Sequence, residues 1–209
     1  MKKLQVLFFA LAAILFIGTA QTATAQKRKP NKRTTTTSPR KKPTTTTQAT
    51  INVNFKGELG LYELRGPVKQ CIWKNDDSEY NLGFDKNGMW VTENGEALGG
   101  DGIVIKRDNE GRIIKRGDPY DEQYTSYSYN SNGLVSKRII QYMDGGDEIH
   151  FYYNSNGECI KCVNSYGDME GSGKVTTKYT IITKDSYGNW TKRRDSKGNI
   201  ETRIITYYE

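Results

Sequence analysis

Residues 129–133 of the chain are Tyr-Asn-Ser-Asn-Gly, and residues 153–157 repeat the same five letters. Four further segments keep a pattern in which Asp or Asn is followed by two variable residues and then by Gly. The polar residue and the glycine of each copy are Asp85 and Gly88, Asp108 and Gly111, Asn130 and Gly133, Asn154 and Gly157, Asp185 and Gly188, and Asp195 and Gly198. Successive glycines are 23, 22, 24, 31 and 10 residues apart, so one structural unit is expected to recur along the chain.

This five-residue pattern fits a reversal of the chain. The Asp or Asn side chain accepts a hydrogen bond from the backbone two residues later, and the two middle residues adopt type I turn angles. Glycine follows because the chain then enters the left-handed region, where a side chain is penalised. Such a turn joins two antiparallel strands with the correct twist, so all six segments are predicted to be hairpin turns.

The composition after residue 50 is that of strands and turns. All fourteen tyrosines lie there, together with only two prolines, Pro67 and Pro119. No stretch of helical length keeps an apolar period of 3.6 residues. We therefore expect residues 51–209 to form an all-β domain, an antiparallel β-meander of repeated hairpins with about ten to twelve strands in a curved open sheet or a partly closed one. The sequence does not decide whether such a sheet closes as a barrel, folds over as two layers or stays open. The glycine-rich segments 144–147 and 167–173 are predicted to be return loops.

The first 25 residues have the parts of a signal peptide. Lys2 and Lys3 precede an unbroken apolar run over residues 6–17, and Ala23 and Ala25 provide the small residues of a cleavage site. A helix of that run is about 18 Å long, which is short of a hydrocarbon core of roughly 30 Å. We expect cleavage after Ala25, export to the periplasm or beyond the cell, and no transmembrane span in the cleaved protein.

Residues 26–50 have a different composition, with eight Lys and Arg, no acidic residue and two runs of Thr. Such a segment cannot bury enough apolar surface to offset the entropy of ordering, so a disordered basic linker is predicted. The cations of residues 27–42 could bind an anionic envelope surface, or they could simply keep a spacer soluble.

The net charge of +7 is unevenly distributed along the chain. After residue 50 there are 21 Lys and Arg against 24 Asp and Glu, which leaves this part at −3. A nucleic-acid-binding fold normally presents a basic surface to phosphates. No specific nucleic-acid partner is therefore expected for the domain.

The repeated Tyr-Asn-Ser-Asn-Gly segments, each after a strand that ends in Tyr, resemble the YD repeat of Rhs-type surface and toxin-shell proteins. The stretch from Lys184 to Trp190, continued through Tyr207 and Tyr208, resembles the ending of small exported repeat proteins of Bacteroidetes type. The resemblance covers most of residues 62–209. Only the two middle copies keep the Tyr, and the chain is too short to enclose cargo as the long Rhs shells do. The resemblance implies an envelope or extracellular β-repeat protein and implies no activity.

Catalytic motifs are missing from the sequence. The single histidine, His150, lies in a predicted strand, and there is no Gly-x-Ser-x-Gly elbow, His-Glu-x-x-His segment or phosphate loop. The acidic pairs Asp76-Asp77, Asp121-Glu122 and Asp147-Glu148 could supply the carboxylates of a glycosidase, but their polar, turn-like surroundings favour solvated charges. We therefore predict no catalytic residue and no enzyme activity.

Metal and cofactor sites are not predicted either. The Asp- and Asn-containing turns offer oxygen atoms that could bind calcium, but the EF-hand spacing is absent and each turn supplies one side chain that already has a structural role. The Cys-x-x-Cys spacing of Cys159 and Cys162 lacks the second pair that a zinc site needs and the helix start of a redox site.

The three cysteines leave two interpretations open. Cys159 and Cys162 would lie about 10 Å apart on opposite faces of a strand, which is too far for a disulfide between them. In an oxidising compartment Cys71 could form a disulfide with either one. Alternatively, all three are small buried hydrophobic residues.

Two functional classes follow. The preferred one is an exported, non-enzymatic interaction module of the cell envelope or the secreted space, with an unknown protein or glycan partner. The alternative is a carbohydrate-binding or carbohydrate-processing protein, which needs a concave pocket with converging carboxylates or aromatic rings, whereas the first predicts flat polar sheet faces. Trp73, Trp90 and Trp190 could line a sugar-binding face, but packing in the core is favoured.

Overall fold

The computed structural model describes residues 54–100, 102–118, 120 and 122–209. The predicted signal peptide (1–25), the predicted linker (26–50) and the first three residues of the predicted domain lie outside the described residues. Asp121, a member of one acidic pair, also lies outside them.

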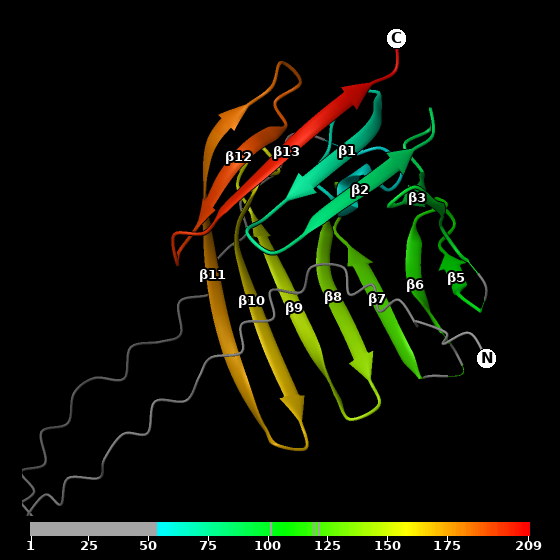
Figure 1. Cartoon of the computed structure of the whole chain (residues 1–209), viewed down its shortest axis with the longest axis vertical. Helices are drawn as coiled ribbons and strands as arrows, with labels where there is room; N and C mark the ends of the chain where they lie inside the picture. The colour runs from blue at the N-terminus through cyan, green and yellow to red at the C-terminus, as the bar shows by residue number, and fades with distance from the viewer. Residues whose placement is uncertain (1–53, 101, 119, 121) are drawn as a thin grey trace, which may run out of the picture. The chain divides into compact units, whose positions relative to one another are not determined.

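The described part is an all-β fold, as the repeats predicted, and it forms one antiparallel sheet (Figure 1). Its strands are β1 (Val68–Lys74), β2 (Glu79–Phe84), β3 (Trp90–Glu93), β4 (Glu96–Ala97), β5 (Val104–Arg107), β6 (Ile113–Asp118), β7 (Gln123–Tyr129), β8 (Val135–Tyr142), β9 (Gly145–Tyr153), β10 (Cys159–Asp168), β11 (Gly171–Lys184), β12 (Trp190–Asp195) and β13 (Ile200–Tyr207). The one helix in this part is a short 3₁₀ turn, η1 (Leu59–Leu61). The strand count of 13 slightly exceeds the expected ten to twelve.

The strand order is β4-β3-β2-β1-β13-β12-β11-β10-β9-β8-β7-β6-β5. Neighbours in the sheet are neighbours in the chain with one exception, because β13 pairs with β1 on one side and with β12 on the other. The strands β4 and β5 are the two edges, so the sheet stays open, which is one of the arrangements that the sequence left possible.

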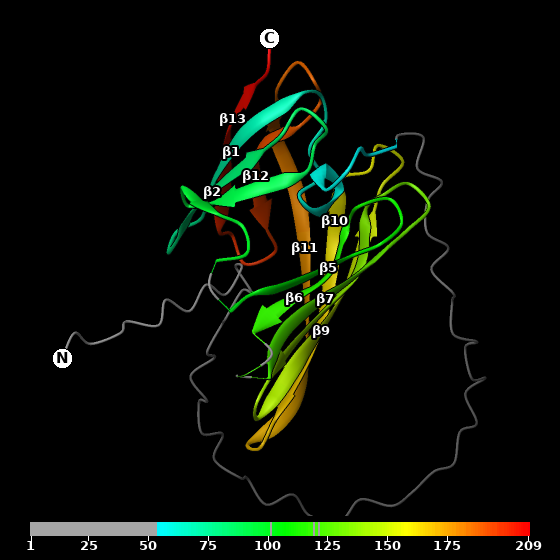
Figure 2. The same cartoon turned by 90° about the vertical axis from the view of Figure 1, so that its right-hand side faces the viewer.

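The sheet folds over on itself at β11. The first part of β11, through Lys178, pairs with β10, and the part from Tyr179 onward pairs with β12. One half of the sheet, called here the β1 half, contains β1–β4, β12 and β13; the other, the β7 half, contains β5–β10 (Figure 2). The sheet face between the two halves is the inner face, and the opposite one is the outer face.

Alternation along the strands assigns side chains to these faces. Arg116 in β6 forms an ion pair with Glu93 in β3 and therefore points inward. Its neighbour Lys115 must point outward, because successive strand residues face opposite sides. In the same register, Tyr127 in β7 and Ile149 in β9 are buried on the inner face.

The predicted turns lie between consecutive strands, and all six have the same geometry. In each, one side-chain oxygen of the Asp or Asn accepts hydrogen bonds from the backbone N–H groups two and four residues later, over 2.8–3.1 Å. The six glycines have φ between 71° and 99°, where any other residue would be strained. Each turn thus satisfies its own backbone donors with a single side chain.

The segment before the first strand closes one end of the fold. Residues 54–66, which contain η1 and are called here the plug, contact the turns directly. The backbone of Phe55 donates to Asn132 O over 2.9 Å, that of Glu58 to Gly88 O over 2.9 Å, and that of Arg65 to Asn189 Oδ1 over 2.7 Å. Five of the six turns lie at this end of the sheet, since only the β12–β13 turn follows a strand that runs away from the plug. Leu59, Tyr62 and Leu64 of the plug are buried.

The prediction of return loops at 144–147 and 167–173 was wrong in extent. Strand β9 starts at Gly145, β10 continues to Asp168 and β11 starts at Gly171, so only short turns remain between them. The glycines serve close strand approach, since a Cβ on Gly145 would lie 2.1 Å from the carbonyl oxygen of Gly167.

Candidate functional site

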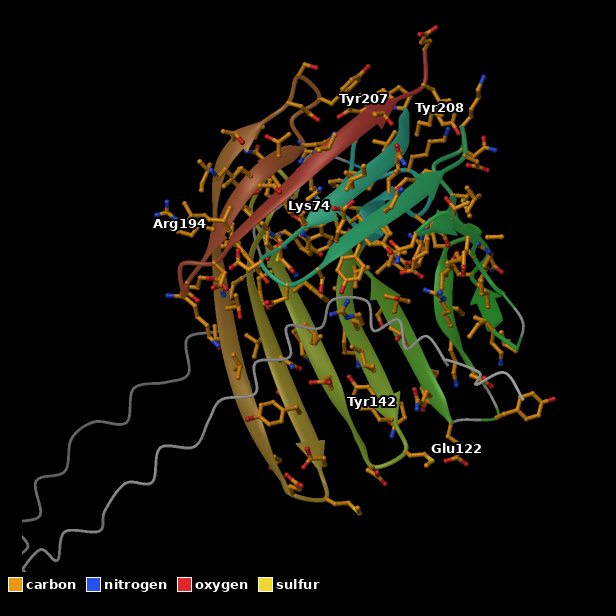
Figure 3. The ribbon with its side chains drawn as sticks, in the orientation of Figure 1. Lys74, Glu122, Tyr142, Arg194, Tyr207 and Tyr208 are labelled. Carbon is orange, nitrogen blue, oxygen red and sulfur yellow. The ribbon has the colours of Figure 1, made fainter. Side chains whose placement is uncertain are left out.

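A pocket of about 620 Å³ opens near the sheet edge of the β7 half, at the end of the strands away from the plug. Figure 3 shows two of its residues, Glu122 and Tyr142, at that end of the β6–β8 strands. The pocket is lined by Val104, Lys106, Lys115, Gly117, Asp118, Glu122, Tyr124, Gln141, Tyr142 and Met143. A pocket of this size with several polar side chains is typical of a small-ligand site.

The floor of the pocket belongs to the outer face. Gly117 is paired with Val104 on one side and with Tyr124 on the other, and Tyr124 is paired with Gln141. Residues in direct register share a face, so these side chains form one row across four strands. Glycine is required in that row, because a Cβ on Gly117 would lie 2.1 Å from the carbonyl oxygen of Gln123.

The pocket contains both positively and negatively charged side chains. The Lys115 ammonium lies 3.5 Å from the centre of the Tyr124 ring, a cation–π contact. The Gln141 amide donates to the carbonyl oxygens of Tyr142 and Gly145, each over 3.1 Å, and so fixes the β8–β9 turn. Asp118 accepts a hydrogen bond from the Tyr120 backbone over 2.8 Å.

Tyr142 connects the pocket to the inner face. Its hydroxyl donates to Asp147 Oδ2 over 3.0 Å, and Asp147 Oδ1 accepts from the Asn164 amide over 2.7 Å. Burial and the hydrogen bond to the Asp147 carboxylate raise the pKa of Tyr142 to about 12. The hydroxyl therefore stays protonated at neutral pH, and its ring holds a fixed position beside the pocket.

The described residues of the acidic pairs lie in different parts of the fold. Asp76 and Asp77 lie in the β1–β2 turn, and adjacent Asp147 and Glu148 point to opposite faces of β9. Of the described members of these pairs, only Glu122 lines the pocket, where it joins Asp118, a residue that was not among the predicted candidates. Two carboxylates therefore come from the β6–β7 region.

His150 lies on the outer face, outside the pocket. Its Nε2 is 2.5 Å from Glu148 Oε1, and this hydrogen bond lowers the pKa of the Glu148 carboxyl. Both side chains are more than 40% exposed, so the pair is a surface contact without a substrate cavity around it.

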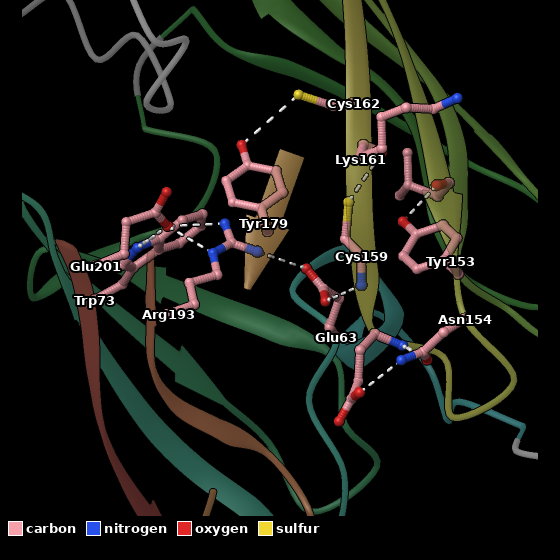
Figure 4. Close-up of polar contacts among 12 residues, drawn as sticks. Glu63, Trp73, Tyr153, Asn154, Cys159, Lys161, Cys162, Tyr179, Arg193 and Glu201 are labelled. Carbon is pink, nitrogen blue, oxygen red and sulfur yellow. Dashed lines mark hydrogen bonds and ion pairs between the residues drawn. The ribbon is translucent and has the colours of Figure 1, made fainter. Parts of the chain in front are cut away.

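A second polar group of residues lies inside the fold, on the inner face of the β1 half (Figure 4). Arg193 donates from Nε and Nη2 to Glu201 Oε2, over 3.0 and 2.8 Å, and from Nη1 to Glu63 Oε1 over 3.3 Å. The guanidinium carbon lies 4.1 Å from the ring centres of both Tyr179 and Trp190. This cluster joins the plug to β11, β12 and β13.

Arg203 adds a second buried cation beside Arg193. Its guanidinium carbon lies 3.5 Å from the centre of the Trp190 ring, and its Nε and Nη1 atoms have no hydrogen-bond partner. Burial lowers the pKa of Arg203 to about 10. With only 4% of Arg203 exposed, this cluster is closed to ligands and acts as part of the core. Sequence reasoning missed it, although Arg193, Glu201 and Arg203 alternate with less buried residues in β12 and β13.

The structure favours the second interpretation of the cysteines, because Cys71, Cys159 and Cys162 are all free and buried in it. Cys71 lies in β1, whose neighbours are β2 and β13, while the other two lie in β10. Cys159 Sγ lies 3.4 Å from Lys161 O, and Cys162 Sγ lies 3.7 Å from the Tyr179 hydroxyl. Burial raises the pKa of the Cys71 and Cys159 thiols, so the alternative of small buried hydrophobic residues describes them.

The tryptophans pack in the core. Trp90 and Trp190 are buried, and Trp73 meets Trp190 edge to face with ring centres 5.9 Å apart. Trp73 Nε1 also donates to Glu201 Oε2 over 3.0 Å. None of the three lines the pocket, and none of the twelve turn residues does.

Two features are absent from the described residues. In this part of the chain, no group of three or more His, Cys, Asp or Glu side chains is placed to hold a metal ion. No helix among the same residues is both long and apolar enough to span a membrane. Comparison with known proteins gave no family model and no curated protein that matches the chain.

Proposed function

We propose that the protein is an exported, non-enzymatic β-repeat protein of the YD-repeat type whose domain is a binding module of the cell envelope or the secreted space. The observation that supports a binding role best is the pocket of about 620 Å³ on the outer face. A concave site with carboxylates and tyrosine rings is the feature expected of the carbohydrate-binding alternative, so the proposal takes a glycan as the ligand of the module. The pocket combines aromatic, amide and charged groups. Such a lining offers a polar ligand both apolar contact area and hydrogen-bonding partners.

A direct binding measurement tests this proposal. The full chain is applied to a glycan array, and any ligand is followed by titration with Tyr124→Ser. Because the Tyr124 ring forms part of the pocket wall, we expect its loss to weaken binding about tenfold or more. The matched control is Tyr166→Ser, which removes a tyrosine from the inner face, and it should leave binding unchanged. Equal binding by the two variants would exclude the pocket.

The predicted linker has a role in the same proposal. The eight cations of residues 26–50 are proposed to hold the module near an anionic envelope surface. Deleting residues 26–50 should release the protein from envelope fractions into the soluble fraction. Unchanged fractionation would refute this role while leaving the pocket untouched.

A carbohydrate-processing enzyme is the second candidate, since Asp118 and Glu122 both line the pocket. Glycosidases use two carboxylates on either side of the bond they cleave. The test is release of reducing ends from any glycan that the array identifies. Turnover that is lost in both Asp118→Asn and Glu122→Gln would establish this candidate, and binding without turnover would exclude it.

A further inference from the structure

The outer face of the β7 half and of the adjoining part of β11 is rich in lysine. Register places six lysines on it, and this set is called here the lysine face: Lys106, Lys115, Lys137, Lys161, Lys174 and Lys178. The one carboxylate in the same rows is that of Glu148. The other side chains of these rows include small ones such as Ser126, Ser165 and Thr176 and larger ones such as Ile139, His150 and Val163.

Two pairs of these lysines are direct cross-strand neighbours. Lys106 is opposite Lys115, and Lys161 is opposite Lys178. Like charges directly opposite each other destabilise a sheet, because the strands are only about 4.8 Å apart. Among the described residues, Lys137 is the one member with a carboxylate in range, at 3.8 Å from Glu148. The face therefore carries a positive charge that the protein leaves largely unneutralised.

On the inner face, in contrast, charged side chains form ion pairs. The cations of this face are arginines, and Glu63, Glu93 and Glu201 there are all in ion pairs with Arg193 or Arg116. Several acidic residues of the domain are thus neutralised internally. The domain can therefore have a net charge of −3 after residue 50 and still present one basic surface.

We infer that the lysine face binds an acidic polysaccharide, carboxylated or sulfated, and that the pocket at its edge holds one of the sugar units. The inference rests on the proposed binding function and names its ligand class. Lysine ammonium groups attract the anionic substituents, while Asp118 and Glu122 in the pocket can accept hydrogen bonds from sugar hydroxyls. The face and the pocket share Lys106 and Lys115, so one chain can reach both.

Single-stranded nucleic acid fits this surface less well. Proteins that bind it stack bases on exposed aromatic rings. Here the Tyr124 ring is covered by the Lys115 ammonium at 3.5 Å, and the Tyr152 ring by the Lys161 ammonium at 3.7 Å.

The test measures binding of the full chain to immobilised heparin, which is sulfated, and polygalacturonate, which is carboxylated, with neutral dextran as a reference. The main variant is Lys161→Ser/Lys178→Ser. The control, Lys69→Ser/Lys86→Ser, removes the same charge from exposed sites outside the lysine face. All variants keep residues 26–50, so the linker contributes equally, and circular dichroism checks that each one folds.

We expect the main variant to bind at least one acidic polymer about tenfold more weakly and to lower the slope of log affinity against log salt by about two, because two ion pairs are lost. The control should match the parent chain. Glu148→Gln, which removes the one negative charge of the face, should bind more tightly.

Equal affinities for the main variant and the control would overturn the inference. So would tighter binding of single-stranded DNA or of anionic lipid vesicles than of both polysaccharides. If a neutral glycan binds in a Tyr124-dependent way while the lysine variants have no effect, the binding module stands and the acidic ligand class is wrong. If Tyr124→Ser binds every ligand normally, the proposed pocket itself fails.

Discussion

Arg116 in β6 and Glu93 in β3 form an ion pair of 2.8 Å, although nine strands separate β6 from β3 in the sheet order. The contact joins two regions near opposite edges of one sheet. Arg116 also lies over the Trp90 ring, with its guanidinium carbon 5.0 Å from the ring centre. The pair therefore helps to hold the two halves of the folded sheet face to face.

Breaking this pair should destabilise the fold. Glu93→Gln leaves the Arg116 guanidinium without its charged partner in a largely buried place, and we expect a loss of about 2 kcal/mol in the free energy of unfolding. The control is Glu79→Gln, which breaks the exposed Lys74–Glu79 pair and should cost less than about 1 kcal/mol. Urea denaturation of both variants measures the difference, and equal losses would contradict the proposed role of Arg116 and Glu93.

The plug should not tolerate a side chain at Gly60. A Cβ there would lie 1.9 Å from the carbonyl oxygen of Gly133, so Gly60→Ala must push the plug away from the β7–β8 turn. We expect a loss of about 2 kcal/mol or more. Gly100→Ala is the control, because a Cβ at Gly100 meets nothing within 4 Å. A Gly60→Ala variant with an unchanged melting temperature would show that the plug is not packed as described.

The turn residue Asp85 should accept Asn but not Ala. Its Oδ1 atom accepts from the N–H groups of Asn87 and Met89, and an amide oxygen can do the same. We expect Asp85→Asn to change stability by less than about 0.5 kcal/mol and Asp85→Ala to cost about 1–2 kcal/mol. Thermal unfolding of both variants checks this, and similar losses would point to the charge instead of the hydrogen bonds.

The two buried arginines should respond differently to replacement by Met. Arg193→Met leaves Glu63 and Glu201 without their directly bonded cation and should cost about 3 kcal/mol. Arg203→Met removes a cation with two unpartnered nitrogen atoms, and we expect a cost at least about 2 kcal/mol smaller. Chemical denaturation compares them, and a larger loss for Arg203→Met would refute this ranking.

The three thiols should be protected in the folded protein. Because burial hides Cys71, Cys159 and Cys162 and raises the pKa of the first two, iodoacetamide should label them only after denaturation. Intact mass under non-reducing conditions should match three free thiols. A mass two hydrogens lighter would restore the disulfide interpretation.

The local structure could be predicted from the sequence because the turn pattern is self-contained. The Asp or Asn oxygen, the two middle residues and the glycine lie within five positions, so Asp85 to Gly88 contains what its turn needs. The all-β meander follows from repeating that unit. The glycines of β9, β10 and β11 could not be assigned from the sequence, since glycine favours loops and close strand approach alike. Only the short distance between the Cβ position of Gly145 and the carbonyl oxygen of Gly167 distinguishes the two.

The sites depend on partners that are distant in the chain. Glu63 forms a hydrogen bond with Arg193, which lies 130 positions later in the chain, and no local sequence pattern predicts that contact. The pocket needs the register of four strands, which sets Gly117 beside Tyr124. The lysine face could have been detected from alternation along the strands. Lys106, Lys115 and Lys161 each adjoin an inward-facing residue, so all three must point to the outer face. Summing charges over the whole domain concealed it.

The position of β13 has a consequence for how the protein is made. The central pairing partner of β1 is the final strand, so β1 has no partner on that side until translation has reached residues 200–207. A nascent chain can form the individual hairpins, but the two halves cannot be joined through β1 before then. The fold is therefore completed late, and the growing chain stays incompletely folded until residues 200–207 have been made.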